Sequence, residues 1–311
     1  MTVPSGTFQT YSAKGNREDL SDVIYNIDPV DTPVMNSIDR TDATAVLHEW
    51  QIDSLASASS SNAVVEGDDA TVDSVTATTR LSNTCQISDK VRSISGTQEA
   101  VRKAGRRSEL GYQMAKSGQE LKRDMETIIC ANTAEVTGDA TTARKLGAIP
   151  AWIKTNADTA GTAGQLGNTA AVNGTQRDFT EAILKNVLLL TWNSGGDPDL
   201  ISVGGFNKQT ASTFTGNSTR YKSAEDSVLN AAIDLYESDF GDLEIVPNRF
   251  QRARDALVLQ KNMWAVAYLR SFTINDLAKT GDSTKKQLLA EYTLESRNEK
   301  ASGIALDLTT S

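Results

Sequence analysis

Histidine and cysteine are scarce in this 311-residue sequence, which contains one histidine, His48, and two cysteines, Cys85 and Cys130. A zinc site needs several His or Cys ligands, and a Ser/His/Asp triad needs a histidine beside a nucleophile. The sequence therefore offers little material for either chemistry. The two cysteines lack a CxxC spacing, and a chain of this length needs no disulfide framework. We expect both thiols to be reduced.

Long apolar runs and an excess of basic residues are also missing. The longest apolar run, around residues 187–190, is far shorter than the roughly 18 residues of a membrane span. The first 20 residues lack the basic and then apolar pattern of a signal peptide. Lys and Arg number 31 against 40 Asp and Glu, a formal net charge of -9, which disfavours a dedicated nucleic-acid binder. We expect a protein that folds in a cytoplasm.

The remaining composition is that of a folded protein with about two domains and an α+β fold class. Hydrophobic residues make up 39% and charged residues 23%, in the normal range for globular chains. A helix is predicted to begin at Thr180 and a second to cover 224–235. A hairpin of 287–295 with 301–308 is predicted at the end of the chain. The other segments with strand-like patterns are 200–203, 243–246, 256–260 and 263–269.

The first 45 residues resemble an extended arm with one short helix over residues 17–27. Asp28-Pro29 ends that helix. Four apolar arm residues have few partners nearby in the sequence, so we expect them to dock on the domain that holds the chain's longest predicted helix or on a neighbouring subunit. They are Leu20, Ile24, Val34 and Ile38. Deleting residues 1–40 is then predicted to leave a folded subunit that cannot assemble.

Residues 46–92 have the pattern of a long hairpin with an acidic loop. Strand-like segments at 46–52 and 80–91 flank a stretch rich in Ser, Ala, Thr and Asp, and no lysine occurs from 46 to 89. Residues 46–79 carry a net charge of -6, from Glu49, Asp53, Glu66, Asp68, Asp69 and Asp73. Because an isolated hairpin is marginal in water, we expect this one to lie on another surface.

The strongest helical pattern follows, from a capping box at Ser95 to about Ala131. Gly105 and Ser108 indicate a kink or a stop and restart. Residues 90–123 contain nine basic and three acidic side chains, a net charge of +6. A solvated helix face is an equally good interpretation of such a charge run. The candidate contact residues on this face are Arg102, Lys103, Arg106 and Arg107.

Residues 154–177 are poor in bulky apolar side chains and are predicted to form a long flexible loop. No GxGxxG or GxxxxGK[ST] spacing occurs, so Gly204-Gly205 does not indicate a phosphate loop. His48 is interpreted as a hydrogen-bonded structural residue and Cys130 as a small buried one. We predict no catalytic residue, no cofactor and no metal site.

The order of these parts resembles the HK97-type architecture of tailed-bacteriophage major capsid proteins, and the SU10-like major head proteins in particular. The residues that carry the resemblance extend from the arm to the last hairpin. They are Arg17–Asp28, Asp31–Pro33, His48–Trp50, Ala104–Arg106, Arg123–Glu126, Ser238–Gly241, Val246–Arg249 and Glu291–Glu299.

The resemblance implies an N-terminal arm (1–45), an extended loop (46–92), a peripheral domain (93–178 and 272–311) with a long spine helix, and an axial domain (179–271). It also implies a virion protein that assembles as hexamers and pentamers into an icosahedral head around double-stranded DNA, which it contacts non-specifically. Decoration, scaffold and portal proteins are the further partners that it allows. Some relatives join subunits covalently through a lysine of the extended loop; with no lysine at 46–89, we expect a non-covalent shell.

Three alternatives remain at this stage. An encapsulin-like nanocompartment would share the fold but would need a groove for docking cargo. An enzyme would have to use the thiols or clustered carboxylates. A host-surface adhesin is favoured only by the Thr/Ala/Gly composition of 154–177.

Overall fold

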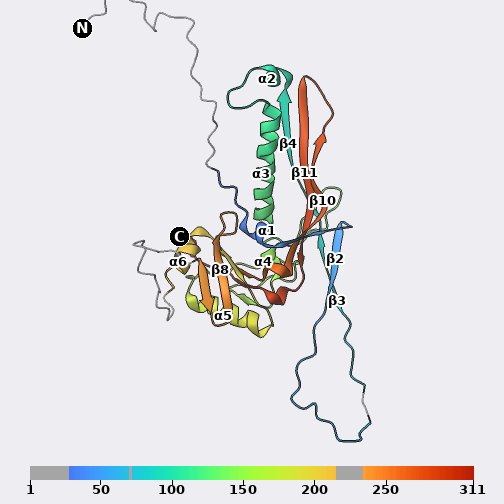
Figure 1. Ribbon diagram of the computed structural model, residues 1–311, viewed down its shortest axis with the longest axis vertical. Helices are drawn as coiled ribbons and strands as arrows, with labels where there is room; N and C mark the ends of the chain where they lie inside the picture. Colours follow the sequence, from blue (N-terminus) through green and yellow to red (C-terminus); the bar gives the residue numbers. More distant parts are fainter. Residues whose placement is uncertain (1–27, 70–71, 215–233) are drawn as a thin grey trace, which may run out of the picture.

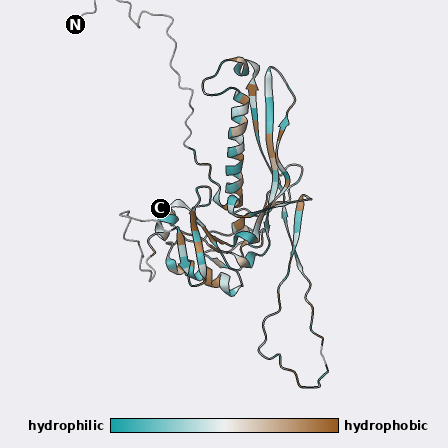
Figure 2. Ribbon diagram, viewed as in Figure 1, coloured by the Kyte–Doolittle hydropathy of each residue, from teal (hydrophilic) through white to brown (hydrophobic). Residues whose placement is uncertain are grey.

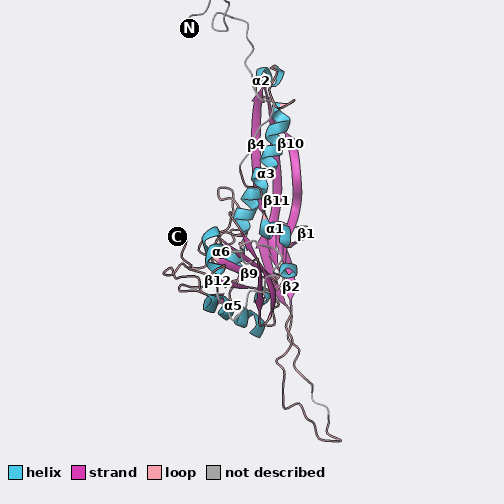
Figure 3. Ribbon diagram, turned by 60° about the vertical axis from the view of Figure 1, so that its left-hand side comes forward, coloured by secondary structure: helices cyan, strands magenta, loops and turns pink. Residues whose placement is uncertain are grey.

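The structure, a computed structural model, describes residues 28–69, 72–214 and 234–311. These residues form an elongated molecule (Figure 1). A long helix, α3, runs beside a four-stranded sheet, and a smaller unit with a second sheet lies at the base of both. A long loop extends from the base in the opposite direction to α3, and a rotated view shows the same arrangement (Figures 1 and 3).

The four-stranded sheet has the strand order β1-β10-β11-β4. Its centre is an antiparallel hairpin of two long strands, β10 and β11. The arm strand β1 adds to β10 in parallel, and β4 pairs with β11 in antiparallel orientation. The four strands are β1 (Asp39–Asp42), β4 (Gln86–Ser95), β10 (Trp264–Asp276) and β11 (Ser283–Ser296).

Two helices follow β4, and each begins at a serine cap. Ser95 Oγ accepts a hydrogen bond from the Gln98 amide at the start of α2 (Gly96–Ala100). Ser108 Oγ accepts one from the Gly111 amide at the start of α3 (Glu109–Ile129). The stop and restart predicted around Gly105 and Ser108 is confirmed, because a serine cap satisfies backbone N–H groups that a new helix leaves unpaired.

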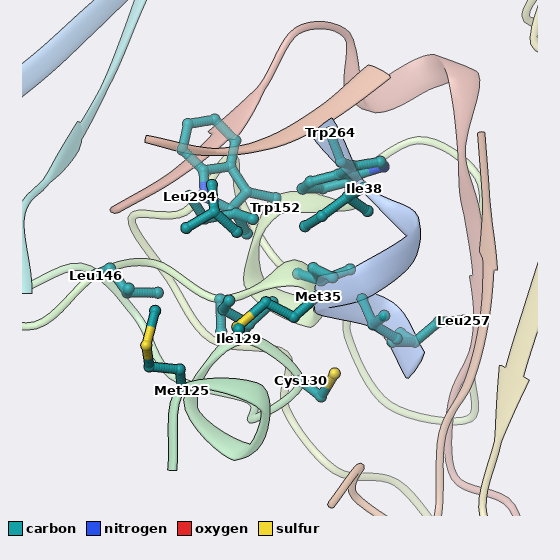
Figure 4. Packing of buried hydrophobic residues seen from close by; sticks show 14 of the residues in the cluster. Met35, Ile38, Met125, Ile129, Cys130, Leu146, Trp152, Leu257, Trp264 and Leu294 are labelled. Atoms are coloured by element: carbon teal, nitrogen blue, oxygen red, sulfur yellow. The ribbon is translucent and has the colours of Figure 1, made fainter. Parts of the chain in front are cut away.

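The main hydrophobic core lies where α3, the four-stranded sheet and the arm helix α1 (Pro33–Ser37) meet. Figure 4 shows Met35 and Ile38 of the arm close to Ile129 of α3 and to Trp264 of β10. All four side chains are at most 5% exposed. The core also includes Trp152 of the short helix α4 (Ile149–Trp152).

The second sheet has six strands in the order β5-β12-β9-β6-β8-β7. Helix α5 (Glu181–Asn193) begins at Thr180, whose Oγ1 accepts from the Ile183 amide, and its apolar side joins a second core with this sheet. Helix α6 (Gly205–Ala211) follows β6. The strands are β5 (Ala157–Asp158), β6 (Leu200–Val203), β7 (Leu235–Ser238), β8 (Gly241–Pro247), β9 (Ala256–Leu259) and β12 (Gly303–Ala305), and two 3₁₀ turns are Lys261–Met263 and Glu299–Ala301.

One predicted element needs correction, and a second lies almost entirely outside the described residues. The hairpin of 287–295 with 301–308 does not form: 287–295 lies in β11, which pairs with β10 and β4, and β12 pairs instead with β9 and β5. Alternation in a sequence identifies a strand but not a partner that is distant along the chain. The helix predicted over 224–235 lies outside the described residues up to 233, and Leu235 begins strand β7.

Residues 154–177 contain little regular structure, as predicted, but they pack against the body through defined hydrogen bonds. The carboxylate of Asp307 accepts from the amides of Gly161 (3.1 Å) and Gly174 (2.8 Å) and from the hydroxyl of Thr159 (2.8 Å). The interpretation as a flexible loop was therefore wrong. The composition of 154–177 could not reveal this order. Most of the bonds are donated by backbone N–H groups to the side chain of Asp307, more than 130 residues further along the chain.

Candidate functional site: surfaces for assembly

The extended loop leaves the body through a two-stranded neck formed by β2 (Leu47–Ile52) and β3 (Thr79–Thr84). Every described residue from 53 to 80 is exposed. Glu49 in the neck forms an ion pair with Arg80. Within the described residues, five other loop carboxylates have no ion-pair partner: Asp53, Glu66, Asp68, Asp69 and Asp73. The predicted acidic surface is therefore present and largely unneutralised.

The loop also exposes aliphatic side chains, which the sequence analysis did not single out. Leu55, Val72 and Val75 are each at least 96% exposed, and Val64 and Val65 at least 76%. Leaving one such side chain in water rather than burying it forgoes about 1.5–3 kcal/mol. Exposed apolar side chains that gather into a patch are typical of surfaces that contact a partner. Valine and leucine within an otherwise polar stretch were the available signal.

The basic surface near α3 is partly neutralised within the chain. Lys103 pairs with Glu99, and Arg106 pairs with Glu109. Arg102 and Arg107 are exposed, and neither has an ion-pair partner among the described residues. Figure 2 shows hydrophilic residues along much of α3. Two of the four predicted contact residues therefore keep a free charge.

The acidic loop and the free arginines lie at opposite ends of the molecule. Arg102 and Arg107 belong to the connection between α2 and α3 at one end, and the loop projects from the other end (Figures 1 and 3). The described part of one chain therefore does not bring these charges together. Contact between them requires a second copy.

Two of the four predicted arm contacts lie inside the same chain. Val34 is fully buried and Ile38 is 5% exposed, and both join the core beside α3. These two side chains dock on their own subunit, one of the two locations expected. Leu20 and Ile24 lie outside the described residues.

The reactive side chains are engaged in structural contacts. Both cysteines are free and fully buried. Burial raises the pKa of Cys85 to about 11, with a contribution from the charge of Glu291, and burial also raises the pKa of Cys130 well above 9.0. His48 contacts Glu295 at 3.1 Å. Both thiols are therefore poor nucleophiles near neutral pH.

The two charged side chains that line a hollow beside β4 are held by contacts within the chain. The hollow is lined in part by Ile87, Gly138, Asp139 and Arg144. Asp139 is bonded to the amides of Thr141 and Thr142, and Arg144 pairs with Glu291. In the part of the chain that the structure describes, no group of three His, Cys, Asp or Glu side chains is arranged to hold a metal ion. No described helix combines the length and apolar character needed to cross a bilayer.

Comparisons with known proteins agree with this architecture. The chain is 26% identical to the major capsid protein of Escherichia phage Phieco32, over 96% of each chain. Its fold is similar to the Cyanophage A-1(L) capsid (TM-score 0.65, 12% identity, 97% of this chain and 98% of that one). It is also similar to the capsid of the native GTA particle (TM-score 0.65, 9% identity, 96% and 98%). The fold is thus the HK97-type α+β fold that the sequence predicted.

The family model for the SU10 major capsid protein matches residues 3–309, nearly the whole chain. The match includes the extended loop, the long helix and both large sheets, and the solved structures of similar fold are capsids. The chain therefore belongs to the SU10 major capsid protein family, and its function is to form the shell of a phage head.

Proposed function

We propose that this subunit assembles non-covalently as hexamers and pentamers into an icosahedral shell around phage DNA, that assembly takes place in the host cytoplasm, and that the chain has no enzymatic activity. The observation that carries the proposal is the outer part of the extended loop, residues 53–79. Its described residues expose five carboxylates without ion-pair partners and five valine or leucine side chains. Such a segment gains most from burial on a complementary partner. The absence of lysine from 46 to 89 supports a shell without covalent links through this loop.

The proposed partner surface is the basic end of α3 on a neighbouring subunit. Arg102 and Arg107 supply free positive charge there, opposite in sign to Glu66, Asp68 and Asp69 of the loop. Complementary charge contributes more to register and association rate than to affinity. A single exposed ion pair contributes only about 0–1 kcal/mol, so the effect must come from contacts repeated around the shell.

The division of the chain into domains is part of the same proposal. The arm keeps its expected bounds (1–45). Because β4 (Gln86–Ser95) pairs with β11 in the four-stranded sheet, we end the extended loop, expected over 46–92, at residue 85. Strand β10 continues from 264 to 276 within the four-stranded sheet, so we place the end of the axial domain after β9, at residue 259. The peripheral domain then consists of 86–178 and the chain from 260 onward.

Charge reversal in the loop tests the contact. Changing Glu66, Asp68 and Asp69 to Lys should impair the formation of empty shells, as seen by electron microscopy of the purified protein. Adding Arg102→Glu and Arg107→Glu to this variant should restore shell formation in part. The matched control replaces the same three acids by Gln or Asn, which should have a smaller effect because it removes attraction without adding repulsion.

A different result would show that the basic residues contact packaged DNA rather than the loop of a neighbouring subunit. If the charge-reversed loop forms normal empty shells while Arg102→Glu and Arg107→Glu impair only DNA-filled particles, these side chains neutralise packaged DNA. Lys103 and Arg106 are weaker candidates for that role, since Glu99 and Glu109 already pair with them. Small globular monomers at all concentrations would contradict shell formation itself.

A further inference from the structure

The extended loop is joined to the described body only through its neck. All described residues from 53 to 80 are exposed, so the direction of the loop is set by β2 and β3. Along β2 the burial pattern alternates strictly, with the even-numbered residues facing the body. Such alternation places every second side chain of a strand on one face. Two of these residues, His48 and Trp50, make side-chain contacts with the end of β11.

Trp50 makes the more extensive contact. Its indole Nε1 donates a hydrogen bond to the backbone oxygen of Ser296 over 2.7 Å. Its ring lies 5.4 Å from the ring of Trp152, which is fully buried in the main core. Its cross-strand partner Leu81 packs against the same core. An indole with one bonded N–H and one apolar contact is fixed in both position and rotation.

His48 adds a second contact on the same face. Its Nε2 lies 3.1 Å from Oε2 of Glu295, and the two side chains are only 14% and 12% exposed. The hydrogen bond from His48 lowers the pKa of Glu295, although burial opposes the shift. Glu295 is held in turn by Arg297, which also contacts Asp39 of the arm strand β1. The histidine contact is therefore connected to both β11 and β1.

On the strand opposite, Asn83 completes the attachment. Its amide donates to the backbone oxygens of Gly147 and Leu294 and accepts from the Gly147 amide. It is fully buried and faces His48 across the two strands. Removing it would leave the buried N–H of Gly147 without an acceptor, although Trp152 Nε1 would still donate to the Gly147 oxygen. Asn83 is therefore a poor probe of loop direction alone.

We propose that His48 and Trp50 are positioning residues that fix the direction in which the extended loop leaves its subunit. This inference rests on the proposed function, in which the loop contacts a neighbouring subunit. A two-stranded ribbon is not rigidly held by its own pairing. A loop already oriented before contact loses less conformational freedom on binding, which favours association.

The test measures loop direction in the unassembled full-length chain. Spin labels are attached at Ser60→Cys in the loop and Lys300→Cys on the body, two exposed positions; the buried native thiols should not react. The test variant combines His48→Gln with Trp50→Phe, which keeps an aromatic ring. The matched control is Glu49→Gln, on the opposite face of the same strand, where Arg80 is its one ion-pair partner among the residues that the structure describes.

We expect a narrow distribution of label-to-label distances in the original chain and in the control, and a clearly broader one in the double variant. An unchanged distribution in the double variant would overturn the proposal. Circular dichroism checks that the variants fold. If the double variant does not fold, Trp50→Phe alone, which removes one hydrogen bond, replaces it in the distance measurement. For that single variant we expect an intermediate broadening, and no broadening would equally overturn the proposal.

Assembly is followed in parallel, without labels, by light scattering. We expect shell formation by the double variant to be roughly fivefold slower or more, because a loop that is no longer oriented loses more conformational freedom on contact. If the distances broaden and assembly keeps its rate, the positioning role stands and the loop contact proposed above fails. If assembly slows without any broadening, the positioning role is wrong.

Discussion

The side-chain amide of Asn248 donates a hydrogen bond to the carboxylate of Glu126 over 2.7 Å, and neither residue is more than 2% exposed. The same carboxylate accepts the backbone N–H groups of Val34 (2.9 Å) and Met35 (2.8 Å) at the start of the arm helix. Glu126 lies on α3, and Asn248 follows β8 of the six-stranded sheet. One buried carboxylate therefore joins the arm, the long helix and the second sheet.

Replacing Glu126 should destabilise the subunit. Glu126→Ala leaves two buried backbone donors without an acceptor, at about 1–3 kcal/mol each. Glu126→Gln keeps the shape and one acceptor oxygen and should cost less. Urea unfolding of the unassembled chain measures both. Equal stability of the alanine variant and the original chain would show that the three contacts contribute nothing.

The same residue should make stability depend on pH. Burial raises the pKa of Glu126 above its ordinary 4.5, although its three hydrogen bonds oppose the shift. The folded chain then holds this proton more tightly than the unfolded chain does. Its contribution to the free energy of unfolding therefore decreases as pH rises from about 4.5 through the folded pKa. The difference between the original chain and Glu126→Gln should show this slope, and a difference that is constant with pH would contradict it.

The sequence predicted local features of this fold better than its long-range pairings. Ser108 and Thr180 were recognisable as helix starts because a cap is a local contact. The strand over 287–295 was recognisable by its alternation, but its partners lie in β4 and β10. Glu126 and Asp307 were not recognised, because a single acidic residue in a sequence does not reveal which distant N–H groups it will accept.

For the candidate contact residues, the sequence showed which side chains are charged but not which of them form ion pairs within the chain. Glu66, Asp68 and Asp69 are exposed and have no ion-pair partner among the described residues, and their contact with a neighbouring subunit stays a prediction. Lys103 and Arg106 were grouped with the free arginines, although acids three or four residues away pair with them. The positions of Glu99 and Glu109 in the sequence could have indicated these pairs.

Asp307 should hold residues 154–177 in place. It has a φ of +63°, a conformation that Asp and Asn tolerate better than most residues. Burial opposes its ionisation, but hydrogen bonds from Thr159, Gly174 and Arg254 outweigh burial and lower its pKa below 3.8. Asp307→Ala leaves Arg254 without its carboxylate, for which about 3–5 kcal/mol is expected.

Two measurements check the role of Asp307. Limited proteolysis should cut residues 154–177 faster in Asp307→Ala than in the original chain. Asp307→Asn, which tolerates the same backbone, should lose only part of the stability. Because its folded pKa is lowered, the contribution of Asp307 is fully present above pH 3.8 and disappears as pH falls through the folded pKa. Identical cleavage of 154–177 in all three chains would contradict this assignment.

The two thiols should be inert in the native subunit. Both are fully buried, and burial raises both pKa values, so a thiol reagent should react only after unfolding. The exposed Ser60→Cys variant is the positive control and should react at once. Cys85→Ala with Cys130→Ala should still assemble, and shells should survive reductant. Disulfide-linked oligomers in native particles would show that the thiols have another role.

The last prediction concerns the arm, for which the structure changes the expectation from sequence. Val34, Met35 and Ile38 are core residues of their own subunit, and β1 pairs with β10. Burying three such side chains contributes roughly 4–9 kcal/mol, comparable with the 5–15 kcal/mol total stability of a typical domain. Deleting residues 1–40 should therefore unfold or aggregate the chain rather than leave a folded subunit that only fails to assemble.

A shorter deletion separates the two roles of the arm. Removing residues 1–27 keeps the arm helix, β1 and the contacts with Glu126, so this chain should be much more stable to urea than the chain without residues 1–40. If shells then fail to form, the removed segment, with Leu20 and Ile24, acts between subunits. Equal stability of the two truncated chains would contradict the core role of Val34, Met35 and Ile38, because only the longer deletion removes them.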